Sequence, residues 1–219
     1  MPKLKAIFFD IDNTLFPTSE FTVLARKRAV RAMVREGLPF GEKEVYKRLL
    51  SVVERYGSNY PKHFDILLRG YGIKRNPRLI ASAVIAYHEA KKHLTPYPDV
   101  PGTLRLLRRK GFRVYALSRG VDVKQWDKLI RLGLHHLFSE VFVTREKDVH
   151  FYRSVLQRLK LKPGEAAMVG DYPRIDVLPA KKAGFVTVHL MKGHHAKDAD
   201  GRKADFQIRA ISELPVVLK

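Results

Sequence analysis

Short apolar runs alternate along this chain with amphipathic stretches that each end just before a glycine. No other feature constrains the fold as strongly. The runs, each suited to a buried strand, are residues 6–9, 112–117, 141–143, 166–169, 185–190 and a last short one at 206–208. Helical spacing marks the stretches 103–110, 123–132 and 175–183, and a glycine follows each of them. Strands joined by single helices pair in parallel, so we predict an α/β fold: a doubly wound, Rossmann-like parallel sheet with helices on both faces.

The stretch between the first two apolar runs is too long for a single crossover helix. Apolar residues recur in it at helical spacing, and Asn76 followed by Pro77 is typical of a helix start. We therefore predict a catalytic core at 1–16 and 98–219, with an inserted helical cap domain at 17–97.

Charge and cysteine content limit the classes of function. With 42 Lys+Arg against 22 Asp+Glu, the formal net charge is +20, which favours phosphorylated ligands, polyanions or anionic membrane surfaces. The chain has 0 Cys, which excludes disulfides, thiolate catalysis and Cys-based metal sites. We see neither a membrane span nor a secretory leader, and we expect a cytoplasmic protein. Few Asn and Gln beside many Lys, Arg and Glu are typical of thermophile proteins.

Polar residues follow three of the predicted strands. Asp10 and Asp12 follow the first and Asp171 and Asp176 the fourth, while Ser118 follows the second. Ligands bind at the carboxyl ends of strands in an open parallel sheet, so we expect these side chains to converge. Each Asp alone also fits a turn or a helix cap. As a set of oxygen ligands they suit Mg²⁺ better than zinc.

At these residues the sequence resembles the haloacid dehalogenase (HAD) superfamily of hydrolases. Residues 8–15 match its first motif, in which apolar residues precede Asp-x-Asp-x-Thr, and Ser118 matches the Ser or Thr of the second. Asp171, with Asp176 five residues on, matches the acidic fourth motif. The predicted insertion lies where the superfamily places its cap domain.

The resemblance implies phosphoryl transfer. Asp10 would attack phosphorus and form an aspartyl-phosphate, and Asp12 would protonate the leaving oxygen and later deprotonate water. Because the dehalogenase branch lacks this second Asp, Asp12 favours a phosphatase over a 2-haloacid dehalogenase.

The resemblance also implies the ligands of a Mg²⁺ cofactor. They are Asp10, the backbone carbonyl of Asp12, and Asp171. Asp176 would bind through water or orient the other ligands.

The remaining assignments concern the phosphoryl group. Ser118 would hydrogen-bond a phosphoryl oxygen, and we assign Thr14 and Arg119 to substrate binding as well. The third motif requires a Lys, for which we choose Lys147, with Arg145 as the alternative. Both could instead be solvated surface charges.

Two histidine pairs carry no predicted function. Neighbours in sequence do not face the same way in a helix or strand, so we expect no shared metal at His135-His136 or His194-His195. The polar segment 193–203 is expected to be a mobile loop.

The leading hypothesis is thus a Mg²⁺-dependent phosphatase of small phosphorylated metabolites, active as a monomer or homodimer, with the cap closing over the site. The pattern is similar to archaeal members of the superfamily that act on glyceraldehyde 3-phosphate, which suggests this or another sugar phosphate. The alternative is a catalytically impaired binding protein whose basic surface, including Arg26, Lys27 and Arg28, serves nucleic acid. A membrane partner is not expected.

Overall fold

The computed structural model describes residues 3–218. The chain divides into two compact units. The core unit consists of Met1–Thr18 and Thr95–Lys219, and the helical unit of Ser19–Leu94. That the first is catalytic and the second a cap stays a prediction.

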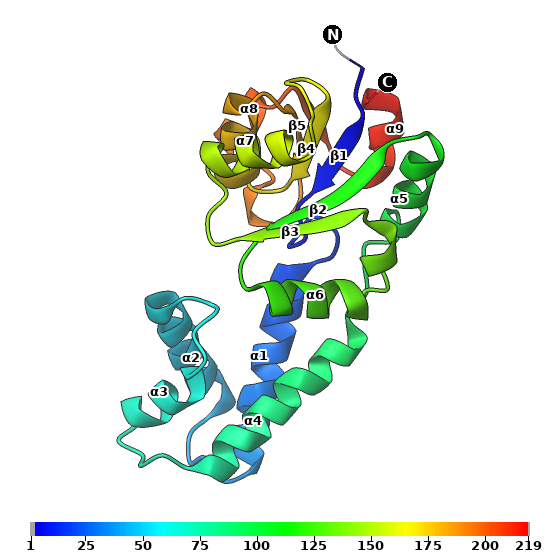
Figure 1. The fold of residues 1–219 in the computed structure, drawn as a ribbon. Coiled ribbons are helices and arrows are strands. Elements are labelled where there is room, and N and C mark those ends of the chain that lie inside the picture. Colours follow the sequence, from blue (N-terminus) through cyan, green and yellow to red (C-terminus); the bar gives the residue numbers. More distant parts are fainter. Residues whose placement is uncertain (1–2, 219) are drawn as a thin grey trace. The chain divides into compact units, whose positions relative to one another are not determined.

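The core unit is built on one parallel sheet (Figure 1). Its strands are β1 (Ala6–Phe9), β2 (Arg113–Arg119), β3 (Glu140–Thr144), β4 (Ala166–Gly170), β5 (Val186–Leu190) and β6 (Phe206–Ile208). They are arranged in the order β3-β2-β1-β4-β5-β6 with every neighbouring pair parallel. The order reverses beside β1, which confirms the predicted doubly wound α/β fold and places β4 next to β1.

Helices cover both faces of this sheet, with α7 and α8 on one side and α5 and α9 on the other (Figure 1). The helices are α5 (Val100–Arg109), α6 (Asp122–Arg131), α7 (Val149–Arg158), α8 (Leu178–Lys182) and α9 (Leu214–Val217). Single helical turns also occur, namely η2 (His135–Leu137), η3 (Pro173–Val177), η4 (Gly193–His195), η5 (Ala199–Lys203) and η6 (Ile211–Glu213).

Aromatic packing fills the α7–α8 side of the sheet. The ring of Phe8 stacks on Tyr115 with centroids 4.7 Å apart and meets the edge of Phe185 at 5.4 Å. Tyr152 of α7 is fully buried in the same cluster. This layer holds β1 and β2 in register, so it also fixes where the residues after β1 emerge.

Two predicted elements differ from the structure in ways that concern the site. Strand β2 continues through Ser118 to Arg119, two residues beyond the predicted end. The helix predicted at 175–183 is instead the π-turn η3 followed by the short helix α8. Pro179 has no N–H to donate, which interrupts regular helical hydrogen bonding at this point.

The segment 193–203, expected to be a mobile loop, contains the turns η4 and η5. The Asp198 side chain accepts a 3.0 Å hydrogen bond from the Asp200 amide and caps η5.

The helical unit contains α1 (Thr18–Arg35), which begins at the end of the core unit, followed by α2 (Glu42–Tyr56), α3 (His63–Gly70), α4 (Pro77–Ala90) and the turn η1 (Lys91–His93). The predicted cap at Asn76 forms, because its side chain accepts from the amides of Arg78 and Leu79 at 3.1 and 3.3 Å. The unit has its own buried core, to which Met33, Leu49 and Leu68 contribute. The predicted apolar stripes therefore pack against one another.

Within residues 3–218, every helix is too short or too polar to cross a bilayer.

Phe8→Ala should lower the free energy of unfolding by about 3–5 kcal/mol, because it removes a buried ring and its stacked neighbours lose their contacts. Urea denaturation measures the loss. Ile85→Ala, at a side chain that is 62% exposed, serves as control and should change stability by less than about 0.5 kcal/mol. Equal losses in the two variants would contradict the assigned packing.

Candidate active site

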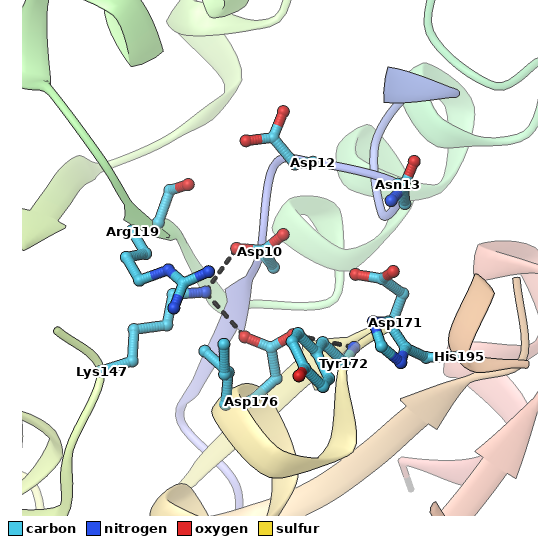
Figure 2. A pocket seen from close by; sticks show the side chains of 11 residues that line it. Asp10, Asp12, Asn13, Arg119, Lys147, Asp171, Tyr172, Asp176 and His195 are labelled. Carbon is cyan, nitrogen blue, oxygen red and sulfur yellow. Dashed lines mark hydrogen bonds and ion pairs between the residues drawn. The ribbon is translucent and has the colours of Figure 1, made fainter. Parts of the chain in front are cut away.

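A pocket opens at the carboxyl edge of the sheet, where β1, β2 and β4 end side by side (Figure 2). The Asp10 amide donates a 2.9 Å hydrogen bond to the carbonyl of Val169, which continues the β1–β4 pairing one residue past the strand. The predicted residues that line the pocket are Asp10, Asp12, Ser118, Arg119, Lys147, Asp171 and Asp176.

Three of these carboxylates form a compact group. Asp10, Asp171 and Asp176 each present an oxygen within 4.8 Å of the others, and all three residues are buried. Buried carboxylates at this spacing repel one another unless a cation offsets their charge. An all-oxygen donor set of this kind fits a hard divalent cation.

The ammonium group of Lys147 contacts two members of this group. It donates to Asp10 and, at 2.7 Å, to Asp176, and the Lys147 side chain is only 1% exposed. Asp148 caps the following helix by accepting a 2.7 Å bond from the Phe151 amide, which fixes the backbone that carries Lys147. Arg145, the alternative in the prediction, is exposed and does not line the pocket.

Gly170 is required for Asp176 to reach the group. A Cβ on Gly170 would lie 2.4 Å from the side-chain carbons and Oδ2 of Asp176. The π-turn η3 turns Asp176 back toward β4, where its Oδ2 accepts a 3.1 Å bond from the Tyr172 amide.

Burial changes the ionisation of these residues. Burial raises the pKa of Asp10 to about 7. The charge of Lys147 lowers this pKa, and the charges of Asp176 and Asp12 raise it. Burial and the charges of Asp10 and Asp176 raise the pKa of Asp171 to about 8. Burial alone would lower the pKa of Lys147, but the two carboxylates outweigh it and raise that pKa. Without a bound cation, the group therefore favours partial protonation near neutral pH.

Asp12 has a different environment from Asp10. Its carboxylate does not belong to the three-membered group, and Figure 2 shows it apart from Lys147 and Asp176. Asn13 takes a left-handed conformation with φ of 56°, so the loop after β1 turns sharply just beyond Asp12. The predicted roles of the two carboxylates, nucleophile and proton donor, require such different settings.

Comparison with known proteins gives the family. The model of the haloacid dehalogenase-like hydrolases matches residues 4–184. The chain belongs to the haloacid dehalogenase-like hydrolase family.

Relatives within this family indicate the type of reaction. A glyceraldehyde 3-phosphate phosphatase from Methanopyrus kandleri is 44% identical over 228 residues, covering 99% of this chain and 97% of the relative. A protein of the same name from Methanocaldococcus jannaschii is 36% identical, with the same two coverages of 99% and 97%. The crystal structure of a HAD phosphatase from Thermococcus onnurineus superposes with a TM-score of 0.71 at 25% identity, covering 98% of each chain. This haloacid dehalogenase-like hydrolase is therefore a phosphoric monoester hydrolase.

The predicted substrate-binding residues of this HAD hydrolase divide into two groups. Ser118 and Arg119, at the end of β2, both line the pocket. Thr14 does not line it and is fully buried. Contact between Thr14 and substrate therefore stays a prediction.

Three neighbours of the pocket carry no predicted role. The rings of Tyr172 and His195 stack with centroids 3.7 Å apart and line the pocket. The argument from adjacent histidines concerns a shared metal only, so it gives no information on whether His195 pairs with an aromatic ring distant in sequence. Lys128 of α6 pairs with Asp12. No sequence motif marks either contact.

Gly170→Ala should lower phosphatase activity at least about 100-fold, because the added methyl displaces Asp176 from Lys147 and from the other carboxylates. Phosphate release measures the effect. Gly102→Ala is the matched control, since a Cβ there meets nothing within 4 Å, and it should keep near wild-type activity. An active Gly170→Ala enzyme would contradict the need for this close approach.

Proposed function

We propose that this phosphatase is Mg²⁺-dependent and hydrolyses small sugar phosphates, with glyceraldehyde 3-phosphate as the first candidate, through an aspartyl-phosphate intermediate. The observation that carries the proposal is the buried position of Asp10 against Lys147, within a group of three carboxylates. The substrate follows the names of the Methanopyrus kandleri and Methanocaldococcus jannaschii relatives. A cytoplasmic location suits such a substrate.

The cation would be held by Asp10, Asp171 and the backbone carbonyl of Asp12, with Asp176 binding through water or orienting the other ligands. The oxygen-only donors and their mutual proximity support Mg²⁺. When bound, Mg²⁺ supplies positive charge that offsets the carboxylates and the phosphoryl oxygens.

In the first half-reaction, a carboxylate oxygen of Asp10 forms a bond to phosphorus as the ester P–O bond breaks. The electron pair goes to the leaving oxygen, which takes a proton from Asp12. Lys147, held by Asp10 and Asp176, offsets the negative charge that gathers on the phosphoryl group. Ser118 donates to a phosphoryl oxygen, and Arg119 adds a second cation at the pocket wall.

In the second half-reaction, water attacks phosphorus and the bond between phosphorus and Asp10 breaks. Asp12 accepts the proton of that water, which restores both residues and releases inorganic phosphate. The net change is one ester and one water converted to one alcohol and one phosphate. We assign substrate selection to the helical unit, whose segment 56–60 is rich in aromatic and polar residues.

Asp10→Asn should reduce hydrolysis of p-nitrophenyl phosphate to background, because an amide cannot act as the nucleophile. A panel of phosphate esters, each assayed with MgCl₂ present, identifies the preferred substrate by kcat/KM. We expect triose and other sugar phosphates to rank first.

Two controls accompany this panel. Halide release from 2-haloacids should be absent, since Asp12 is present. A wild-type protein no more active than Asp10→Asn, but binding DNA or RNA with steep salt dependence, would overturn the proposal in favour of the binding-protein alternative.

Mg²⁺ should stabilise the protein more as pH rises from about 6 to about 8.5. The pKa values of Asp10 and Asp171 are raised to about 7 and about 8, so protons compete with the cation over this range. Thermal melts with and without MgCl₂ at matched ionic strength measure the gain in Tm. Once the site is saturated, each tenfold rise in the affinity for Mg²⁺ adds about 1.4 kcal/mol to the free energy of unfolding.

The same two groups destabilise the metal-free protein as pH rises. Their pKa values are higher in the folded chain than in the unfolded chain, so between about pH 4 and 8 the folded state binds more protons. Their stabilising contribution is therefore complete below about pH 4 and is lost as pH passes about 7 to 8.

The Asp171→Asn variant tests the Mg²⁺ prediction. Its Mg²⁺-dependent gain in Tm should be small and nearly independent of pH. A wild-type gain that falls with pH would contradict this account.

A further inference from the structure

Asp12 is held by a cation that the proposed mechanism does not use. The Lys128 ammonium lies 2.6 Å from Oδ1 and 2.7 Å from Oδ2 of Asp12, so one amine binds both carboxylate oxygens. The two side chains are 23% and 30% exposed, respectively. This pair joins α6 to the loop after β1 across 116 residues of sequence.

Each Asp12 oxygen receives a second donor. The Thr18 hydroxyl donates to Oδ1 at 2.8 Å, and the Gln125 amide makes a longer 3.4 Å contact with Oδ2. Gln125 also donates to the carbonyl of Arg119 at 3.0 Å, so it is anchored to the end of β2. Three donors, two from α6 and one from Thr18, therefore fix the rotation of this carboxylate.

Lys128 itself is held in place by its helix. Gln125 and Leu129 of α6 are buried on either side of it in sequence, and the helix contacts β3. The Lys128 ammonium also lies 6.0 Å from the ring of Phe16. A long side chain tethered in this way can impose one orientation on its partner, although fixing it costs rotamer entropy.

Lys128 is not among the residues that line the pocket. Asp12 lines the pocket, as do Arg119 and Lys147, whereas Lys128 does not. Its charge therefore reaches substrate through Asp12, which distinguishes it from the cations placed to contact a phosphoryl group.

We propose that Lys128 is a positioning residue for Asp12: from outside the pocket it holds the carboxyl group in one orientation. In the acid form, one Asp12 oxygen carries the proton and faces the leaving oxygen, while the other keeps its contact with Lys128. The proposal rests on the proposed function, in which Asp12 is the proton donor. Asp12 acts only on the leaving oxygen, so Lys128 matters in this step only where departure of the alcohol needs a proton.

The leaving group provides the test. p-Nitrophenolate departs without a proton, whereas an alkoxide requires one, so only alkyl phosphates depend on a well-placed acid. We would measure kcat/KM, which reports steps up to release of the alcohol, with p-nitrophenyl phosphate and with the best alkyl phosphate found for the wild type. Lys128→Met should lower the value for the alkyl phosphate about 10- to 100-fold, within the range of acid catalysis, and for p-nitrophenyl phosphate less than about 3-fold.

Two further variants exclude a merely structural effect. Arg131→Met removes one positive charge and one ion pair, that with Asp127 at 2.7 Å, from the same helix, and should affect both substrates equally and slightly. Lys128→Arg keeps a cation and should recover at least part of the alkyl phosphate activity. In an Asp12→Asn background, Lys128→Met should cause no further loss, because the two residues act as one unit.

The outcomes separate the two proposals. If the wild type hydrolyses neither ester, the proposed function fails and the role of Lys128 fails with it. If the wild type is active but Lys128→Met lowers both substrates equally, or raises only KM, Lys128 acts on fold or phosphate binding and the inference is wrong while the function stands. A loss confined to the alkyl phosphate, absent in the Asp12→Asn background, supports it.

Discussion

The crowding of buried carboxylates at the end of β1 and β4 is the constraint on which the rest of this structure depends. Asp10, Asp171 and Asp176 meet there because the sheet order places those strands side by side, and one ammonium, that of Lys147, is buried with them. Three negative charges against one positive charge form an incomplete set, and the raised pKa values of Asp10 and Asp171 express the same imbalance. A divalent cation would complete it, and its binding energy would then also stabilise the fold.

In the proposed mechanism, two aspartates only two positions apart have different roles. Asp10 is buried and bound by Lys147, while Asp12 is partly exposed and held by Lys128 beyond the sharp turn at Asn13. A nucleophile benefits from a fixed position among cations, and a proton donor must lie within hydrogen-bond reach of the leaving oxygen. The loop after β1 supplies both settings within one motif, because its backbone reverses immediately after Asp12.

Local patterns were enough to predict the sheet and the carboxylates. The bounds of β1 and β6 agree with the apolar runs, and parallel pairing alone brings Asp10 near Asp171. Contacts made by helices and loops could not be obtained in this way. The approach of Lys128 to Asp12 depends on how α6 packs, the stacking of His195 on Tyr172 depends on the path of η4, and the π-turn η3 depends on the fit between Gly170 and Asp176. These are long-range properties with no periodic signal in the sequence.

The net charge of the chain, +20, is opposite in sign to the three carboxylates of the candidate site. A phosphorylated substrate meets a basic exterior first, and attraction over distances near the Debye length, about 8 to 10 Å at physiological salt, raises its encounter rate. At the pocket floor, the local sign is negative until a cation binds, so the exterior alone cannot retain the substrate. Steering and retention are therefore separate functions of separate charges. In the proposed mechanism, the surface lysines and arginines affect association and its salt dependence, while Lys147 and the cation would hold the phosphoryl group for attack.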